Sequence, residues 1–281
     1  MFTRRAVRIR PPIRPETKGA LPIVREILRA ESLKKTFRLS AKQRKLQKTK
    51  DKFITAVDDL SFSAYEGEIF GLLGPNGAGK TTTLRMLATL IKADAGDAFI
   101  DGAGIRTQPD AVRAKIGFLT SELKLEEFFT PDYLFDFFSK IHRIDANTRA
   151  ARKEELFRRF GADEFASVKV ANLSTGMKQK ASLAISLVHD PKIIIFDEPT
   201  NGLDVITAKV VTDFLLELRA EGKTVIVSTH IFSLIEKICD RVGIIINGGM
   251  AVCDTLSAVT NGRPLEDVFF DLYAEKAGRR V

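Results

Sequence analysis

The stretch GPNGAGKTT at residues 74–82 matches the pattern G-x-x-x-x-G-K-[ST], which is typical of loops that bind phosphate groups. An apolar run precedes it, and apolar residues with helical spacing follow it as far as Ile91. Glycines let successive N–H groups turn inward, and a helix N-terminus adds free amides and a positive dipole end. Lys80 offers a point charge to the β- and γ-phosphates, and Thr81 offers a hydroxyl to Mg²⁺. The predicted nucleotide contacts are Gly74, Pro75, Asn76, Gly77, Ala78, Gly79, Lys80, Thr81 and Thr82.

Two adjacent carboxylates end the apolar run IIIFDEP at residues 193–199. In an open sheet of parallel strands, ligands bind at the carboxyl ends of the strands, where these side chains would lie. We expect Asp197 to hold Mg²⁺ through water and Glu198 to orient and deprotonate an attacking water molecule. In isolation the pair could be two solvated acids, but beside a phosphate loop the catalytic interpretation is favoured.

A histidine ends another predicted strand, VIVSTH at residues 225–230. His230 follows Asp197 by 33 residues, with one predicted helix between them. A lone histidine is usually structural, but this spacing predicts that His230 reaches the γ-phosphate from the neighbouring strand. The predicted catalytic residues are therefore Lys80, Glu198 and His230.

The elements that must hold these residues follow an alternating pattern. Residues 53–74 read as two strands joined at Glu66–Gly67, and residues 131–171 read as helices. The continuous apolar strand IIIF is typical of a parallel sheet that is buried on both faces. Strands then alternate with helices toward the C-terminus. The pattern predicts an α/β fold with a mainly parallel core sheet, an antiparallel β portion and a helical insertion.

The helix start NLSTGMKQK, residues 172–180, indicates which class of phosphate-loop protein this is. Here the chain resembles the ATP-binding-cassette (ABC) ATPases, P-loop NTPases whose signature is usually L-S-G-G-Q-x-[QR]-[RK]. Thr175 and Met177 replace a glycine and a glutamine of that signature. The positions that match are Leu173, Ser174, Gly176, Gln179 and Lys180. No N-K-x-D motif follows the phosphate loop, which disfavours GTPases.

The resemblance continues through FDEPTNGLD and the His230 switch, and it covers residues 27–272. It implies ATP and Mg²⁺ as cofactors and a head-to-tail homodimer in the ATP-bound state. Each signature then faces the partner's ATP, with Ser174 and Gly176 toward its γ-phosphate. The implied dimer interface consists of Ser174, Thr175, Gly176 and Asp204. In the alternative interpretation, Ser174 only caps its own helix.

The predicted domain organisation has three parts. Residues 1–26 form a basic N-terminal extension, and residues 27–272 form the ABC ATPase domain. The helical insertion lies at about 122–180 within that domain, and residues 273–281 form a C-terminal tail.

Two further site residues depend on the register of the resemblance. The family's switch glutamine falls at Ser121, which we expect to contact the metal, with Glu122 as the alternative. Phe37 is the candidate for stacking on adenine, because base stacking on an aromatic face is worth about 1–3 kcal/mol. The alternative for Phe37 is an ordinary core position.

The charge is divided unevenly along the chain. Residues 1–52 hold 17 Lys and Arg against 4 Asp and Glu, a net charge of +13, whereas the remaining 229 residues have a net charge of −5. A nucleic-acid-binding body would be basic on its folded domain, so no nucleic-acid partner is expected. The basic excess lies in the N-terminal arm and in KQRKLQKTKDK at residues 42–52, and it is either solvated polar sequence or a contact for anionic lipids, the latter proposed for the N-terminal arm.

Apolar runs are far shorter than the roughly 18–20 residues of a membrane helix, and no secretory signal is recognisable.

The partners are inferred from the resemblance. Phe128 and Phe129 are candidates for contact with an integral-membrane permease subunit. The chain looks like the ATP-binding subunits of ABC-2-type exporters, particularly sodium-export ones, bound peripherally at the cytoplasmic face of the cell membrane. The alternative is a soluble ABC ATPase that acts on nucleic acid or ribosomes.

Overall fold

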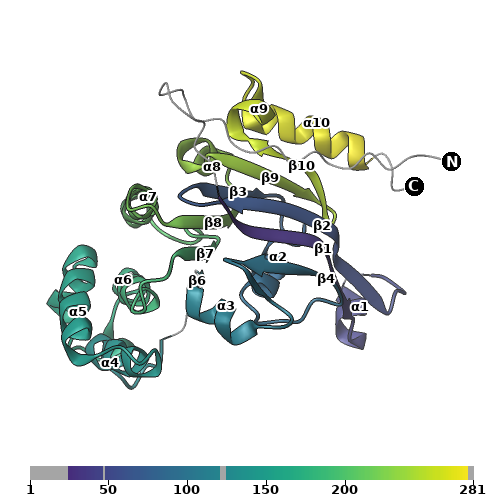
Figure 1. Cartoon of the computed structure of the whole chain (residues 1–281). Coiled ribbons are helices and arrows are strands. Elements are labelled where there is room, and N and C mark those ends of the chain that lie inside the picture. The colour runs from purple at the N-terminus through teal and green to yellow at the C-terminus, as the bar shows by residue number, and fades with distance from the viewer. Residues whose placement is uncertain (1–24, 47, 121–124, 278–281) are drawn as a thin grey trace.

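The computed structural model describes residues 25–46, 48–120 and 125–277 (Figure 1). The strands are β1 (Glu26–Arg38), β2 (Phe53–Tyr65), β3 (Ile69–Leu73), β4 (Ala95–Ile100), β5 (Ala103–Gly104), β6 (Ile116–Thr120), β7 (Ile193–Asp197), β8 (Thr224–Thr229), β9 (Arg241–Ile246) and β10 (Gly249–Thr255). The α-helices are α1 (Ala41–Leu46), α2 (Lys80–Leu87), α3 (Pro109–Lys115), α4 (Pro131–Ile141), α5 (Ala146–Phe160), α6 (Thr175–Ser186), α7 (Val205–Ala220), α8 (Phe232–Ile238), α9 (Leu256–Thr260) and α10 (Leu265–Ala277). Two 3₁₀ turns cover Asp163–Phe165 and Val170–Asn172.

The described strands form two sheets. One has the order β2-β1-β4-β5 and is antiparallel throughout. The other has the order β10-β9-β3-β8-β7-β6, in which every pair is parallel except that of β10 with β9. The predicted mainly parallel core sheet with an antiparallel β portion is confirmed.

Strand β7 shows why its apolar run is continuous. Ile193 and Ile195 point into the core shared with the antiparallel sheet, α2 and α3. Ile194 and Phe196 point into the opposite core, which includes residues of α6, α7 and α8. Because both faces of β7 are covered, every position along it is apolar until the strand reaches Asp197.

The helices predicted within residues 131–171 are present as α4 and α5. Asp145 caps the start of α5 by accepting hydrogen bonds from two backbone amides, and Gly161 ends it with φ of 60°. Figure 1 shows α4, α5 and α6 gathered at one end of the molecule, away from β1, β2 and α1. None of the helices in the described ranges is long and apolar enough to span a bilayer.

The helix after the phosphate loop is shorter than its apolar spacing indicated. We expected helical positions as far as Ile91, but α2 ends at Leu87. Thr89 has a φ of 60°, in the left-handed region that helices do not propagate through, so the chain turns away there. Leu87 still packs in the core beneath the antiparallel sheet.

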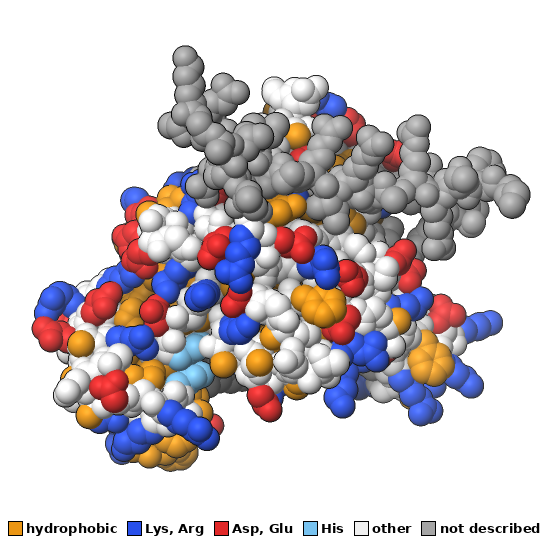
Figure 2. Space-filling model, in the orientation of Figure 1, with side chains coloured by type: hydrophobic (Ala, Val, Ile, Leu, Met, Phe, Trp, Pro, Cys, Tyr) orange, Lys and Arg blue, Asp and Glu red, His pale blue; other side chains and the backbone are white. Residues whose placement is uncertain are grey.

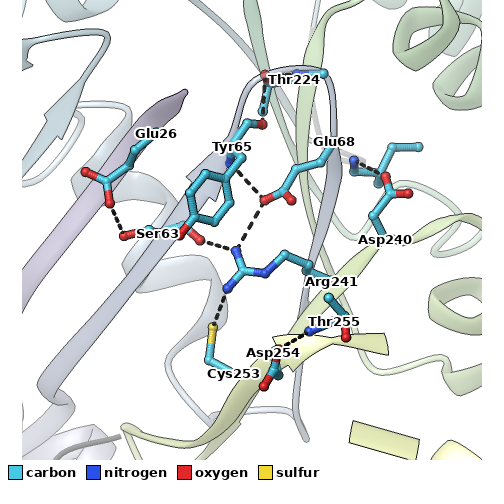
Figure 3. Close-up of polar contacts among 12 residues, drawn as sticks. Glu26, Ser63, Tyr65, Glu68, Thr224, Asp240, Arg241, Cys253, Asp254 and Thr255 are labelled. Atoms are coloured by element: carbon cyan, nitrogen blue, oxygen red, sulfur yellow. Dashed lines mark hydrogen bonds and ion pairs between the residues drawn. The ribbon is translucent and has the colours of Figure 1, made fainter. Parts of the chain in front are cut away.

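A buried arginine joins the two sheets (Figure 3). Arg241, at the start of β9, is fully buried, and its Nη1 donates to the carbonyl of Ser63 at 2.7 Å. The same nitrogen lies 3.4 Å from Glu68 Oε1, and the guanidinium lies 4.9 Å from the centre of the Tyr65 ring. Its Nη2 contacts Cys253 Sγ at 3.8 Å. The cluster therefore connects β9 and β10 to β2 through a buried, desolvated guanidinium group.

Burial raises the pKa of Glu68 to about 7, although the neighbouring Arg241 opposes that shift. Glu68 Oε1 also accepts from the Tyr65 amide at 2.9 Å, while Oε2 has no hydrogen-bond partner among the described residues. Asp240 adds a further negative charge nearby. Glu68 therefore loses its proton in the folded protein only near neutral pH.

We predict that Glu68 makes stability depend on pH. Its pKa is higher in the folded than in the unfolded chain, so the folded state binds more protons and stability falls as pH rises through about 7. The loss of unfolding free energy is on the order of 3 kcal/mol as the pH rises from about 4.5 to about 7. In Glu68→Gln this part of the slope is absent. Urea unfolding between about pH 5 and pH 8 measures it.

Glu66→Gln is the matched control, because Glu66 is exposed two residues away. Its unfolding free energy should follow that of the wild type at each pH. If the curves of Glu68→Gln and the wild type run parallel across the same range, Glu68 does not titrate in this window.

Candidate functional site

The phosphate loop lies between β3 and α2, and other strands press against its backbone. A Cβ atom at Gly79 would lie 2.3 Å from the carbonyl oxygen of Ala56, and Gly79 has a φ of 106°. A Cβ atom at Gly74 would lie 2.4 Å from the carbonyl oxygen of Ile245. Both positions therefore require glycine, for close approach as well as for conformation.

The start of α2 is open toward the loop. Gly79 occupies the N-cap position without a side chain to satisfy the first amides of the helix. Lys80 is buried, and its Nζ donates to the carbonyls of Gly74 at 2.8 Å and Pro75 at 3.3 Å. A free helix N-terminus and an ammonium group thus converge on one loop, as an anion site requires.

Asp197 lies at the end of β7, and the carboxylate is nearly buried. Its Oδ1 accepts a hydrogen bond from Thr81 Oγ1 at 3.0 Å and another from the Ser228 hydroxyl. Hydroxyl and carboxylate oxygens are the ligands that Mg²⁺ prefers. The described residues contain no group of three or more His, Cys, Asp or Glu able to hold a metal ion. Thr81 and Asp197 therefore fit Mg²⁺ that takes its remaining ligands from water and phosphate.

Glu198 is held between the two other predicted catalytic residues. Its Oε1 lies 3.2 Å from Lys80 Nζ, and its Oε2 lies 3.0 Å from His230 Nδ1. The backbone of Glu198 has a φ of 50°, a conformation that costs a non-glycine residue about 1–2 kcal/mol. Its amide donates to the carbonyl of Ser228 at 3.1 Å, which stabilises this turn. The structure therefore brings Lys80, Glu198 and His230 together at one edge of the sheet.

Phe37 lies near the loop and on the surface. It pairs with Ile54 across β1 and β2, two residues from Ala56, whose carbonyl touches the phosphate loop. Its side chain is 38% exposed, and Lys35 Nζ lies 5.6 Å from the centre of its ring. The alternative of an ordinary core position is wrong, and the adenine contact stays a prediction.

The signature residues lie at the start of α6. Ser174 is the N-cap, and its hydroxyl accepts from the Met177 amide at 3.3 Å, so the capping contact exists. A Cβ atom at Gly176, next to Thr175, would lie 3.8 Å from Thr207 Oγ1 at the start of α7.

Asp204 caps α7 by accepting from the amides of Ile206 and Thr207. A hydrogen bond from the Thr207 hydroxyl lowers the pKa of Asp204. The signature and the Asp204 turn therefore form one continuous surface. Figure 1 shows α6 well apart from α2, the helix that follows the chain's own phosphate loop.

Two contacts of the site were not found from the sequence. The run VIVSTH gave no role to Ser228, yet Ser228 contacts both Asp197 and Glu198. The Gly248 amide donates to the carbonyl of Ala78 in the phosphate loop at 3.1 Å. The sequence signal there, INGG, indicates only a tight turn between strands. The predicted metal contact Ser121 and its alternative Glu122 lie outside the described residues.

Comparison with known proteins agrees with this geometry. The profile of the ABC transporter family matches residues 57–201. The ABC transporter ATP-binding protein NatA of Bacillus subtilis is 36% identical over 220 residues, which cover 78% of this chain and 89% of NatA. The daunorubicin resistance ATP-binding protein DrrA3 of Streptomyces coeruleorubidus is 33% identical over 216 residues, which cover 76% of this chain and 68% of DrrA3.

Solved structures show the same fold. An ATP-binding subunit of an ABC transporter superposes with a TM-score of 0.75 at 25% identity, covering 88% of this chain and 99% of that one. A dimeric ATP-binding cassette in a post-hydrolysis state with ADP and Pi gives a TM-score of 0.71 at 25% identity, covering 82% and 98%.

This chain belongs to the ABC transporter family. Its cassette fold and the chemistry at the edge of its core sheet are those of an ABC ATPase, an ATP-binding and ATP-hydrolysing subunit.

We predict that Lys80→Ala weakens ATP binding at least tenfold, because it removes the cation that converges on the phosphate loop. Titration calorimetry of the purified chain measures the affinity. Lys92→Ala is the control, since Lys92 is exposed beyond the end of α2. Equal affinities for the two variants would refute the assigned role of Lys80.

Proposed function

We propose that this chain is the ATP-hydrolysing subunit of a membrane exporter, bound peripherally at the cytoplasmic face of the cell membrane. The observation that carries the proposal is the position of Glu198 between Lys80 and His230, beside the Thr81–Asp197 pair. The Glu198 carboxylate lies beside the phosphate loop and beside the Thr81–Asp197 pair that fits Mg²⁺. A carboxylate in this position suits activation of a water molecule that attacks a γ-phosphate.

The proposed mechanism assigns one task to each residue. Lys80 and the amides at the start of α2 bind the phosphates, and Thr81 with Asp197 would hold Mg²⁺. Mg²⁺, when bound, neutralises phosphate charge. Glu198 accepts the proton of the attacking water, and His230 orients that carboxylate through Nδ1. Ser228 keeps both acids in place by contacting the Asp197 carboxylate and the Glu198 amide.

We further propose that the active form is a homodimer with two composite sites. Ser174, Thr175 and Gly176 lie at the start of α6, which Figure 1 shows well apart from α2, and Asp204 at the start of α7 would complete the interface. Ser174 and Gly176 at a helix N-terminus form donors suited to a phosphate, and a second copy would supply that phosphate. A similar cassette was solved as a dimer with ADP and Pi, which supports this arrangement.

A permease subunit is the proposed membrane partner. An apolar cleft of about 390 Å³ lies between the core sheet and the inserted helices, lined in part by Phe118, Leu134, Phe138 and Ile185. Phe128 and Phe129 are exposed just before α4. The cleft suits a short apolar segment of a permease. A segment seated there would transmit movement of α4 and α6 against the core sheet to the permease.

The resemblance to sodium-export ATP-binding proteins makes sodium ion the proposed cargo. Related chains have names that refer to linearmycin resistance, daunorubicin resistance and Nod factor export, which favours export as the shared task. No observation favours the alternative of a soluble ABC ATPase acting on nucleic acid or ribosomes.

We predict that Glu198→Gln retains ATP binding but hydrolyses ATP at least a hundredfold more slowly, because glutamine cannot accept the proton. Without hydrolysis the ATP-bound dimer should accumulate. Light scattering at saturating ATP measures the mass, and phosphate release measures the rate.

Glu154→Gln serves as the control, since Glu154 is exposed on α5. It should hydrolyse ATP at the wild-type rate. A Glu198→Gln chain that stays monomeric with ATP bound, or that hydrolyses ATP normally, would contradict the assignment of the base.

A further inference from the structure

The described residues between β1 and β2, 39–46 and 48–52, form a small folded unit. Ser40 and Gln43 form a reciprocal capping box at the start of α1: the Ser40 amide donates to Gln43 Oε1 at 2.8 Å, and the Gln43 amide donates to Ser40 Oγ at 3.2 Å. The Leu39 amide donates to the Lys52 carbonyl at 2.8 Å, and the Leu39 side chain is buried. The segment is therefore anchored at its base and capped at its helix.

This unit presents positive charge outward. Asp51 is its one acid, and that carboxylate accepts a hydrogen bond from the Thr49 hydroxyl at 3.0 Å. Among the described residues, no ion pair involves any basic side chain of the segment or its flank. These side chains are Arg38, Lys42, Arg44, Lys45, Lys48, Lys50 and Lys52. We call these residues, together with the apolar residues Leu46, Phe53 and Ile54, the basic tip.

Apolar side chains stand among these charges. Leu46, at the end of α1, is 73% exposed, and Phe53, at the start of β2, is 60% exposed. Ile54 is also exposed. Figure 2 shows the blue basic side chains gathered over α1 and the adjoining ends of β1 and β2, with hydrophobic surface among them. No described element covers Leu46 or Phe53, so both remain in water.

We propose that the basic tip binds the surface of a membrane that contains anionic lipids. Lysines attract the headgroup phosphates and carboxylates, while Leu46 and Phe53 bury their side chains at the boundary with the acyl chains. The tip exposes two aliphatic side chains, Leu46 and Ile54, and a single ring, Phe53, on which successive nucleobases could not stack, which favours a bilayer over single-stranded nucleic acid. Lipid binding at the basic tip requires neither ATP hydrolysis nor a permease, so it stands independently of the proposed function.

The test is co-sedimentation of the full-length chain with vesicles, without detergent. Vesicles of phosphatidylcholine alone are compared with vesicles that contain about one-third phosphatidylserine. We expect binding to the anionic vesicles and its weakening by salt. The quadruple variant Lys42→Gln, Lys45→Gln, Lys48→Gln, Lys50→Gln should bind at least tenfold more weakly, since each basic residue near such a surface multiplies affinity about fivefold.

A matched control removes the same charge elsewhere: Lys92→Gln, Lys169→Gln, Lys192→Gln, Lys237→Gln, all at exposed positions. Binding should then fall by less than threefold. Leu46→Ser with Phe53→Ser keeps the charge, and should weaken binding to anionic vesicles about tenfold. ATP hydrolysis by every variant is measured in parallel and should be unchanged, which shows that each is folded.

Three results would overturn the proposal. One is wild-type binding by the basic-tip lysine variant, which would leave the N-terminal arm as the source of affinity. Another is equal loss in the matched control. The third is tighter binding of a single-stranded oligonucleotide than of the anionic vesicles, with that binding lost in the basic-tip variant.

Discussion

The pairing of β3, β8 and β7 as parallel neighbours is the constraint on which the site depends. It aligns Leu73 with Thr229 and Asp197 with Ser228, so that three strands end at the same level. The residues that follow them are the phosphate loop, His230 and Glu198. Because each strand is buried on both faces, a shift in register would also break the core on either side. Catalytic geometry and hydrophobic packing are therefore maintained by the same backbone hydrogen bonds.

The antiparallel sheet contributes to the site through its backbone. The carbonyl of Ala56 in β2 limits Gly79 to glycine, and the turn at Gly248 binds both the phosphate loop and Asp58. Arg241 and Glu68 hold this sheet on the core through a buried pair whose desolvation is costly. Removal of the Glu68 side chain would leave the buried guanidinium of Arg241 without its carboxyl partner at this junction. The buried pair thus favours one relative position of the sheets, and the loop depends on that position.

Much of the site could be predicted because its residues follow strand ends in short motifs. The convergence of Lys80, Glu198 and His230 needed only the sheet type and the chain order. Contacts such as those of Ser228 with Asp197 and of Arg241 with Ser63 depend on pairing between distant segments, which no local pattern encodes. The length of α2 was overestimated, because apolar spacing continues past the left-handed residue Thr89 that ends the helix.

The contacts of Glu198 also bear on its proposed role as the base. Its two carboxylate oxygens face Lys80 and His230, so an attacking water molecule must share each oxygen with a neighbour that is already in place. Lys80 also binds two carbonyls of the phosphate loop, the same loop that receives the phosphates. When phosphates draw Lys80 toward themselves, Glu198 loses one of its two partners. Oε1 of Glu198 is then free to face the attacking water molecule, so the proposed order, binding before hydrolysis, has a geometric reason.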